Sequence, residues 1–277
     1  MRAVAGAGRG GAPSSLPRPL NVPVIIDFFS GEGNFGRECS AAGFYVLLWD
    51  IRLGPKYDLV SRHNRSMIIG WVTAALVQGW GAGIPCGTFS RARDAPPGPF
   101  PLRSDAEPMG KSDLHTWASH IDMDKVRVAN ILLVFICGLA HVSRVNGIPW
   151  YIENPRTSRL WLTSHVCALK RNSKISSIIT DYCMWGKSWR KSTQFMFFKV
   201  DLSSCVRRCL GAPRGLCART LKKHFRLEGH VVGREKYDRA WNTAYGNAYP
   251  ISLCKAIANA FYDVHVQTRA RKFAKHI

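Results

Sequence analysis

The chain has 277 residues, 46% of them hydrophobic and 11% aromatic, which is enough to bury a full core and excludes an intrinsically disordered chain. Its 39 Lys and Arg against 18 Asp and Glu give a formal charge of +21, which indicates a polyanionic partner. Nucleic acid is the first candidate; an anionic membrane surface and a merely basic exterior are the alternatives.

The cysteine content and the first residues predict the cellular setting. Nine cysteines are an odd number, in a chain too large to need disulfide staples. No continuous apolar leader is visible in residues 1–20, which are rich in Gly, Ala, Pro, Ser and Arg and are predicted to form a disordered basic tail. We therefore expect reduced thiols and an intracellular protein, nuclear if the source is eukaryotic.

The first half of the chain predicts a βαβ unit followed by a further helix and strand. Residues 22–29, "VPVIIDFF", form an apolar run typical of a buried parallel strand. A Gly-rich turn and a helix over 30–44 lead to a second strand over 45–50, "YVLLWD". Helical spacing over 66–78 then precedes a short strand that runs into "GIPCGTFSRAR" at 83–93.

The next segment is predicted to be a long loop between two elements of the sheet layer. Residues 95–113 are rich in Pro and Gly, and a loop of this length in a compact domain is usually functional, so we expect residues 91–113 to form a lid. An amphipathic helix is predicted over 124–145. Its apolar run at 129–142 is too short to span a membrane and indicates burial. A strand over 148–155, "IPWYIENP", follows.

The last third predicts two strands, a basic segment and a closing helix. Strand-like runs lie within 177–200, and residues 201–243 are basic and contain three cysteines. Together the elements predict an α/β fold: an open, mostly parallel, Rossmann-like sheet with helices on both faces and a small basic Cys/His-rich insert. We expect a main domain of residues 21–200 and 244–277, an insert of residues 201–243, and a monomer.

A cofactor site is predicted at the carboxyl end of the first strand, where ligands bind in open parallel sheets. Gly31 and Gly33 allow a tight turn and a close approach to a ligand, and Asp50 lies 23 residues after Asp27, where a carboxylate suits a ribose hydroxyl pair. The stretch has neither a Walker lysine nor the Gly-x-Gly-x-x-Gly pattern. It therefore favours S-adenosylmethionine, with a Gly-rich turn that binds nothing as the alternative.

Four motifs resemble those of the cytosine-5 DNA methyltransferases, in the order of that family. They are "DFFSGEGNFGRECSAAGF" from residue 27, "GIPCGTFS" from residue 83, "YIENP" from residue 151 and "YGNAYPISLCKAIANAF" from residue 245. They extend from Asp27 to Phe261, nearly the whole chain. The resemblance implies a short, divergent member, of a kind found in mobile elements, with a Rossmann-like fold that uses S-adenosyl-L-methionine.

The resemblance also implies roles for individual residues. Cys86 would attack carbon 6 of a flipped cytosine, Glu153 would contact ring nitrogen 3 and the exocyclic amine, and Asn154 would fix the turn. Ser90, Arg91 and Arg93 would meet phosphate. The cofactor-binding set would comprise Asp27, Phe29, Ser30, Gly31, Gly33, Asn34, Asp50, Ile51, Asp58, Pro85 and Asn247.

One motif of the family is poorly matched. "GKSWRKSTQFMFF" from residue 186 stands where the family has Gln-x-Arg-x-Arg, with Trp189 in place of Gln and Lys191 and Thr193 in place of the two arginines. We expect Arg190, one step out of register, to replace an arginine in catalysis and Lys191 to contact nucleic acid. A solvated basic hairpin is the alternative.

The basic insert contains a candidate metal site. Cys205, Cys209, Cys217 and His224 offer three thiolates and an imidazole, which suit tetrahedral zinc, and His230 is an alternative to His224. A region so small and polar lacks a core, so a structural zinc would help it fold. The alternative interpretation is that the three cysteines are incidental members of a basic loop and bind no metal.

The sequence thus predicts S-adenosylmethionine-dependent methylation of carbon 5 of cytosine in DNA, with no membrane partner. Methylation of RNA is the first alternative, because one branch of the family acts on transfer RNA. A non-catalytic nucleic-acid-binding protein with the same fold is the second. The retained Cys86 and Glu153 argue for an enzyme, and the altered basic hairpin argues for the non-catalytic protein.

Overall fold

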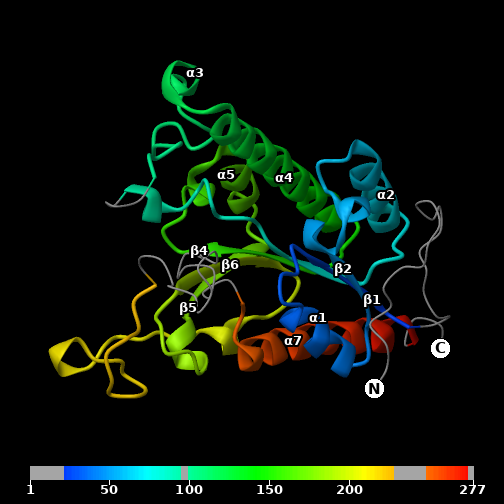
Figure 1. The fold of residues 1–277 in the computed structure, drawn as a ribbon. Coiled ribbons are helices and arrows are strands. Elements are labelled where there is room, and N and C mark those ends of the chain that lie inside the picture. The colour runs from blue at the N-terminus through cyan, green and yellow to red at the C-terminus, as the bar shows by residue number, and fades with distance from the viewer. Residues whose placement is uncertain (1–21, 95–98, 228–247, 274–277) are drawn as a thin grey trace.

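A computed structural model describes residues 22–94, 99–227 and 248–273 of the chain (Figure 1). Within them lies a six-stranded sheet with the strand order β2-β1-β3-β4-β6-β5. The strands are β1 Val24–Phe28, β2 Tyr45–Trp49, β3 Gly79–Gly83, β4 Trp150–Pro155, β5 Ile175–Asp181 and β6 Ser192–Phe198. The α-helices are α1 Asn34–Ala41, α2 Arg62–Thr73, α3 Leu114–Trp117, α4 His120–Val145, α5 Ser164–Lys170 and α7 Ile251–Phe273.

The direction of the strands brings several loops to one edge of the sheet. β1 pairs with β2 and β3 in parallel, and β3 pairs in parallel with β4. β6 runs antiparallel to both β4 and β5. The chain moves from β1 to β2 on one side and then crosses to β3 on the other, so the strand order reverses beside β1. The carboxyl ends of the parallel strands therefore open at a topological switch point, the usual ligand position in such sheets.

Helices cover both faces of the sheet, as the sequence predicted. Figure 1 shows α2, α4 and α5 on one face and α1 and α7 on the other. The first core includes Trp80 of β3, which stacks on Trp150 of β4 with ring centroids 5.5 Å apart and donates its indole N–H to Ser143 of α4. The second core packs α7 through Phe261 against Tyr151 of β4. The expected α/β class, a mostly parallel sheet between two helical layers, is confirmed.

Two helices begin earlier than the sequence periodicity predicted, because serine caps begin them. Ser61 accepts a hydrogen bond from the backbone N–H of Asn64 at 3.5 Å, so α2 begins at Arg62 rather than at residue 66. Ser119 accepts from the N–H of Asp122 at 3.1 Å, so α4 begins at His120 rather than at residue 124. α2 also ends at Thr73, short of residue 78.

α4 is long and apolar enough to cross a membrane by length and composition alone, with a mean hydropathy of 1.9 over its most apolar window. Of that window, 56% is buried within the protein. The buried side chains, such as Leu133, Ile136 and Leu139, belong to the core shared with the sheet. Packing against the sheet thus accounts for the apolar character of this helix, as predicted for a buried helix. The helix is longer than the apolar run at 129–142, so the prediction that it is too short to span a membrane does not hold for α4 as a whole.

The Pro- and Gly-rich segment is held in place by a buried arginine. Arg103 is 1% exposed and stacks on the ring of Phe89 at 3.8 Å. Its guanidinium donates to Thr88 Oγ1 at 2.9 and 3.0 Å, to the carbonyl of Pro108 at 2.8 Å and to Asn130 Oδ1 of α4 at 2.9 Å. Burial lowers the pKa of this arginine to about 10. One side chain thus joins the loop after β3, the long segment and α4.

We expect Arg103→Met to lower the free energy of unfolding by roughly 3 kcal/mol or more, because several buried acceptors lose a charged donor at once. Urea denaturation would measure the change. Arg127→Met on the exposed face of α4, where the side chain is 58% exposed, is the matched control and should change the value by less than about 0.5 kcal/mol. Equal effects of the two substitutions would contradict the anchoring role of Arg103.

Candidate functional site

Four segments meet at the carboxyl edge of the parallel strands. They are the Gly-rich turn after β1, the end of β2, the loop after β3 and the end of β4. The sequence placed its candidate residues on these same segments, and the parallel pairing brings them to one edge. Their geometry decides what the edge can do chemically.

The turn after β1 is built from left-handed backbone conformations. Phe29, Gly31 and Gly33 have φ values of 56°, 56° and 67°. Such a value is unusual for Phe, and backbone of this kind concentrates at functional sites. The carboxylate of Asp50, at the end of β2, accepts the N–H of Gly31 at 2.9 Å and the N–H of Arg52 at 2.9 Å. Asp50 thus fixes the turn and keeps lone pairs for a ligand, since each carboxylate oxygen can accept more than one hydrogen bond.

Asp27 lies apart from this opening. Its side chain is 4% exposed and accepts the N–H of Gly36 in α1 at 3.1 Å. Burial raises the pKa of Asp27 to about 7, opposed by the Gly36 hydrogen bond and reinforced by the charge of Asp50. In this structure the side chain anchors α1 beneath the turn, and the cofactor-contacting role that we expected for it stays a prediction.

The other residues expected to bind a cofactor are distributed around the turn. Ser30 accepts the N–H of Gly33 through its carbonyl, and Asn34 donates its side-chain amide to the carbonyl of Tyr249 at 2.8 Å. Ile51 is 57% exposed beyond β2. Asp58 accepts the N–H of Val60 at 2.8 Å, and Pro85 is exposed in the loop after β3. Asn247 lies outside the described residues.

Cys86 sits in a tight turn directly after β3. Its carbonyl accepts the N–H groups of Phe89 and Ser90 at 2.9 and 2.8 Å. Asn154 of β4 donates its amide to the carbonyl of Ile84 at 2.7 Å, which ties the start of this turn to the neighbouring strand. Burial raises the pKa of the Cys86 thiol, the positive charge of Lys191 lowers it and the charge of Glu153 raises it again. The thiol thus lies within the electrostatic reach of a carboxylate and an ammonium group.

Glu153 gathers three donors around one buried carboxylate. Its side chain is 5% exposed and forms an ion pair with Lys191, with an Nζ–Oε1 distance of 3.6 Å. Tyr249 and Tyr182 donate their hydroxyls to it at 3.0 and 3.4 Å. Sequence reasoning missed both tyrosines. Tyr249 lies within the last of the four motifs, which was a usable signal, whereas no signal in the sequence pointed to Tyr182.

The hairpin between β5 and β6 places Lys191, rather than Arg190, next to Glu153. Arg190 points to Asp181, with an Nε–Oδ1 distance of 3.6 Å, and its side chain is 43% exposed. Lys191 is 16% exposed and faces Glu153 and, at 5.0 Å, the ring of Tyr182. The basic group beside Cys86 is therefore Lys191, and Arg190 lies outside the cluster.

The residues expected to contact phosphate are engaged within the protein. Arg91 pairs with Asp105 and donates to the carbonyl of Thr157 at 3.0 Å. Arg93 donates to the carbonyl of Phe100 at 3.1 Å, and the hydroxyl of Ser90 accepts the N–H of Ala92 at 3.1 Å. These contacts fasten the start of the long segment close to the Cys86 turn.

Sequence reasoning also missed Arg159, which holds the same segment from the other side. It is buried, donates to both carboxylate oxygens of Asp94 at 2.9 and 2.7 Å, and donates to Asp105 at 3.1 Å. The described parts of the segment expected to form a lid are thus anchored by Arg103 and Arg159. Polar residues scattered along 94–159 gave no periodic signal that could have predicted this.

The cysteine and histidine cluster differs in one member from the set that we expected. Cys209, Cys217 and His224 come together with Cys183, which lies in the short helix after β5, and the four ligand atoms all lie within 4.8 Å of one another. Cys205 is buried in the apolar core under α7. The prediction of Cys205 as a ligand was therefore wrong, because sequence spacing could not show that a distant hairpin supplies the fourth group. His230 lies outside the described residues.

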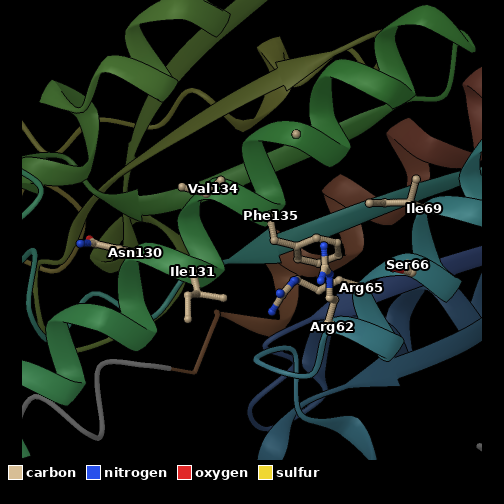
Figure 2. A pocket seen from close by; sticks show the side chains of 9 residues that line it. Arg62, Arg65, Ser66, Ile69, Asn130, Ile131, Val134 and Phe135 are labelled. Atoms are coloured by element: carbon tan, nitrogen blue, oxygen red, sulfur yellow. The ribbon is translucent and has the colours of Figure 1, made fainter.

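A groove of about 510 Å³ lies between α2 and α4, and none of the residues predicted for the site lines it. Figure 2 shows Arg62 and Arg65 of α2 on one side and Asn130 and Val134 of α4 on the other. Arg65 donates to the carbonyls of Leu59 and Val60 at 3.0 and 2.6 Å, so its guanidinium supports the loop before α2.

Comparisons with known proteins give similarities of fold only. No protein-family model matches the chain. No curated protein matches it either. Among solved structures, an S. pombe Dnmt2 methyltransferase has a TM-score of 0.35 at 12% identity, with 64% of this chain and 49% of that chain covered. A DNA modification methyltransferase encoded within a prophage (E. coli) has a TM-score of 0.38 at 12% identity, covering 79% of this chain and 63% of that one.

A third similar structure is the Entamoeba histolytica methyltransferase EhMeth, with a TM-score of 0.35 at 9% identity and coverage of 88% of this chain and 96% of that chain. This chain therefore spans about half to two-thirds of the length of the first two proteins.

The buried acid predicts a pH-dependent stability difference. Between the usual pKa of 3.8 and about 7, native Asp27 holds a proton that the unfolded chain has lost, so stability falls as pH rises through this window and levels off above it. Asp27→Asn is neutral throughout and can still accept from Gly36. We expect its free energy of unfolding to exceed that of the wild type by roughly 2–4 kcal/mol at pH 8 and by little at pH 4.5.

Chemical denaturation at a series of pH values measures this difference. Asp124→Asn on α4, where the carboxyl is 58% exposed, is the control and should leave the pH dependence of the free energy of unfolding as it is in the wild type. A difference between Asp27→Asn and wild type that does not vary with pH would show that Asp27 is ionised in the folded protein.

Proposed function

We propose that the chain is an S-adenosylmethionine-dependent methyltransferase that acts on carbon 5 of cytosine in DNA. The observation that carries this proposal is the convergence of Cys86, Glu153 and Lys191 at the carboxyl edge of the sheet. This edge also carries the left-handed turn at Gly31 and the Asp50 carboxylate. A nucleophile, a base-recognising carboxylate and a nucleoside-binding turn are the groups that the reaction needs.

The residues after β1 and β2 fit the proposed cofactor. Its bound sulfonium supplies an electrophilic methyl group. The carboxylate of Asp50 accepts one backbone hydrogen bond at each oxygen and has an ion pair with Arg52, with an Nε–Oδ1 distance of 3.6 Å. Because each oxygen can accept a second hydrogen bond, it can still receive ribose hydroxyls. The exposed apolar side chain of Ile51 can lie against an adenine ring, and Asp58 follows at the same edge. Gly31 and Gly33 keep side chains away from the turn.

Cys86 has to be activated before it can attack. Burial holds its pKa above the usual value, so the free protein keeps the thiol protonated at neutral pH. Lys191 opposes this effect and would stabilise the thiolate when the thiol proton passes to the Glu153 carboxylate. The thiolate would then form the Sγ–carbon 6 bond, and the electron pair of the ring double bond would move to carbon 5. Carbon 5 would take the methyl group as the bond between that methyl and the sulfonium sulfur breaks, with the neutral thioether of the cofactor as the leaving group.

Glu153 is placed to polarise the ring during this addition. The Glu153 carboxyl, held in one orientation by hydroxyl donors from Tyr182 and Tyr249, would pass the proton that it received from the thiol to ring nitrogen 3 and accept a hydrogen bond from the exocyclic amine. Loss of the proton from carbon 5 to a base then re-forms the ring double bond and expels Cys86 as the thiolate. No external oxidant or reductant is required.

The proposed substrate follows from charge and access. The formal charge of +21 suits a polyanion, and a cytosine can reach Cys86 only after it leaves the helical stack. Flipping a base requires a few kcal/mol, which a basic surface can offset through phosphate contacts. DNA is the proposed substrate, and RNA is the alternative outcome of the experiment below.

We expect Cys86→Ser to abolish methyl transfer and adduct formation. The assay incubates protein with labelled S-adenosylmethionine and either DNA or RNA, digests the product to nucleosides, and tests an oligonucleotide that contains 5-fluorocytosine for a covalent complex. Cys167→Ser, at another half-buried thiol, is the control and should retain activity. Wild-type protein that labels neither polymer and forms no adduct would disprove the enzyme function, whereas label in RNA alone would replace DNA as the substrate.

Lys191→Met and Arg190→Met separate the two basic residues of the hairpin. Lys191→Met removes the charge that lowers the Cys86 pKa, so transfer should fall roughly 10- to 100-fold and alkylation of Cys86 should require a higher pH. Arg190→Met should change the rate by no more than about threefold, because its partner Asp181 keeps Arg208. A larger loss of transfer in Arg190→Met than in Lys191→Met would show that Arg190, rather than Lys191, is the basic residue that supports catalysis.

A further inference from the structure

Three buried thiols and one imidazole lie together at the junction of the hairpin and the basic insert. Cys183, Cys209 and Cys217 are 0%, 1% and 2% exposed, and His224 is half-buried beside them. Cys183 comes from the sheet layer, at the end of β5, while the other three lie within residues 209–224. All three cysteines are free.

The separations fit a tetrahedral metal site. Bond lengths of about 2.3 Å to sulfur and 2.0–2.1 Å to nitrogen give tetrahedron edges of roughly 3.8 Å between two sulfurs and roughly 3.6 Å between sulfur and nitrogen. Cys209 Sγ lies 3.9 Å from Cys217 Sγ and 3.7 Å from His224 Nε2. A disulfide would instead bring two sulfurs to about 2.05 Å. These two separations match the edges that a tetrahedral zinc site requires, and the Cys183 sulfur lies within 4.8 Å of the other three ligand atoms.

The surroundings favour thiolates. The backbone N–H of Ala218 donates to Cys209 Sγ at 3.4 Å, and such hydrogen bonds tune sulfur ligands in metal sites. Arg219 crosses from the insert to the carbonyl of Cys183 at 2.5 Å, which brings a positive charge to the rim. Three thiolates and an imidazole form a closed set of four ligands, as in structural rather than catalytic zinc sites.

The insert has little else to hold it together. Among its described residues, 201–227, regular structure is limited to two short 3-10 helices and one isolated bridge between Ala212 and Leu216. Leu210, Leu221 and Phe225 are 91%, 66% and 54% exposed. A segment with so little buried apolar surface gains order from a metal more than from a core.

We propose that Cys183, Cys209, Cys217 and His224 bind one structural zinc ion that clamps the basic insert to the β5–β6 hairpin. The metal site does not depend on the proposed methyl transfer. It spans two parts of the chain that are distant in sequence, so metal binding closes the loop between them.

The clamp also reaches the hairpin that carries Lys191. The buried carboxylate of Asp181 accepts the N–H of Cys209 at 2.7 Å, and the N–H of Phe225 donates to the carbonyl of Ser188 at 2.9 Å. The donor of the first bond is the ligand residue Cys209, and the donor of the second is Phe225, which follows the ligand residue His224. Both acceptors belong to the hairpin. Zinc therefore fixes the hairpin that places Lys191 against Glu153, and its loss should loosen residues 182–191.

The test begins with metal analysis of the full chain purified without added chelator. We expect about one equivalent of zinc in wild type and in Cys205→Ala, and loss of nearly all of it in Cys183→Ala and in Cys217→Ala. Cys205→Ala is the matched control, because that cysteine belongs to the same insert but lies in the apolar core. Metal-free wild type, or loss of zinc in Cys205→Ala with retention in Cys183→Ala, would overturn the proposal.

Two measurements on the wild-type chain test the proposal without substitutions, because a variant could lose zinc simply by failing to fold. Replacement of zinc by cobalt(II) should give the visible absorption of a tetrahedral thiolate site. Amide hydrogen exchange before and after chelation should show faster exchange at residues 182–191 and 209–225, with little change in β1 and β3. A disulfide between Cys209 and Cys217 under reducing purification, or exchange unchanged by chelation, would contradict the clamp.

Discussion

The parallel pairing of β3 with β4 is the constraint on which the site depends. It sets Gly83 opposite Glu153, so the chain that continues from Gly83 through Ile84 and Pro85 delivers Cys86 beside that carboxylate. The missing side chain at Gly83 is part of the arrangement, because a Cβ there would lie 2.5 Å from Tyr249 Oη. Strand pairing and one glycine thus bring a thiol, a carboxylate and a phenol together.

The two buried carboxyl groups at this edge, Glu153 and Asp27, differ in their surroundings. Glu153 is surrounded by an ammonium group and two hydroxyls, so its burial is compensated by donors. Asp27 has one backbone donor, and burial raises its pKa to about 7 instead. The first arrangement holds a charge close to Cys86, and the second anchors α1 without placing a full charge under the turn.

The periodic parts of the fold were predictable from the sequence because each strand or helix repeats its apolar residues at its own spacing. The fully buried β1 and the core-packed α4 are examples. The cap serines Ser61 and Ser119 lengthened two helices beyond their apolar pattern. Arg103 and Arg159 were not predictable, since each joins segments far apart in the chain through geometry that has no period.

The sequence by itself determined the fold class, the turn at Gly31 and Gly33, and the placement of Cys86 and Glu153 at the ends of neighbouring strands, because these follow from local patterns and from the rule that parallel strands end at one edge. Only the tertiary structure decided which basic residue faces Glu153 and which cysteine completes the tetrahedral cluster. Lys191 and Arg190 are adjacent, but the direction of the hairpin points one inward and the other to Asp181. Cys205 lies within the insert and Cys183 lies outside it, but chain packing brings Cys183, not Cys205, to His224.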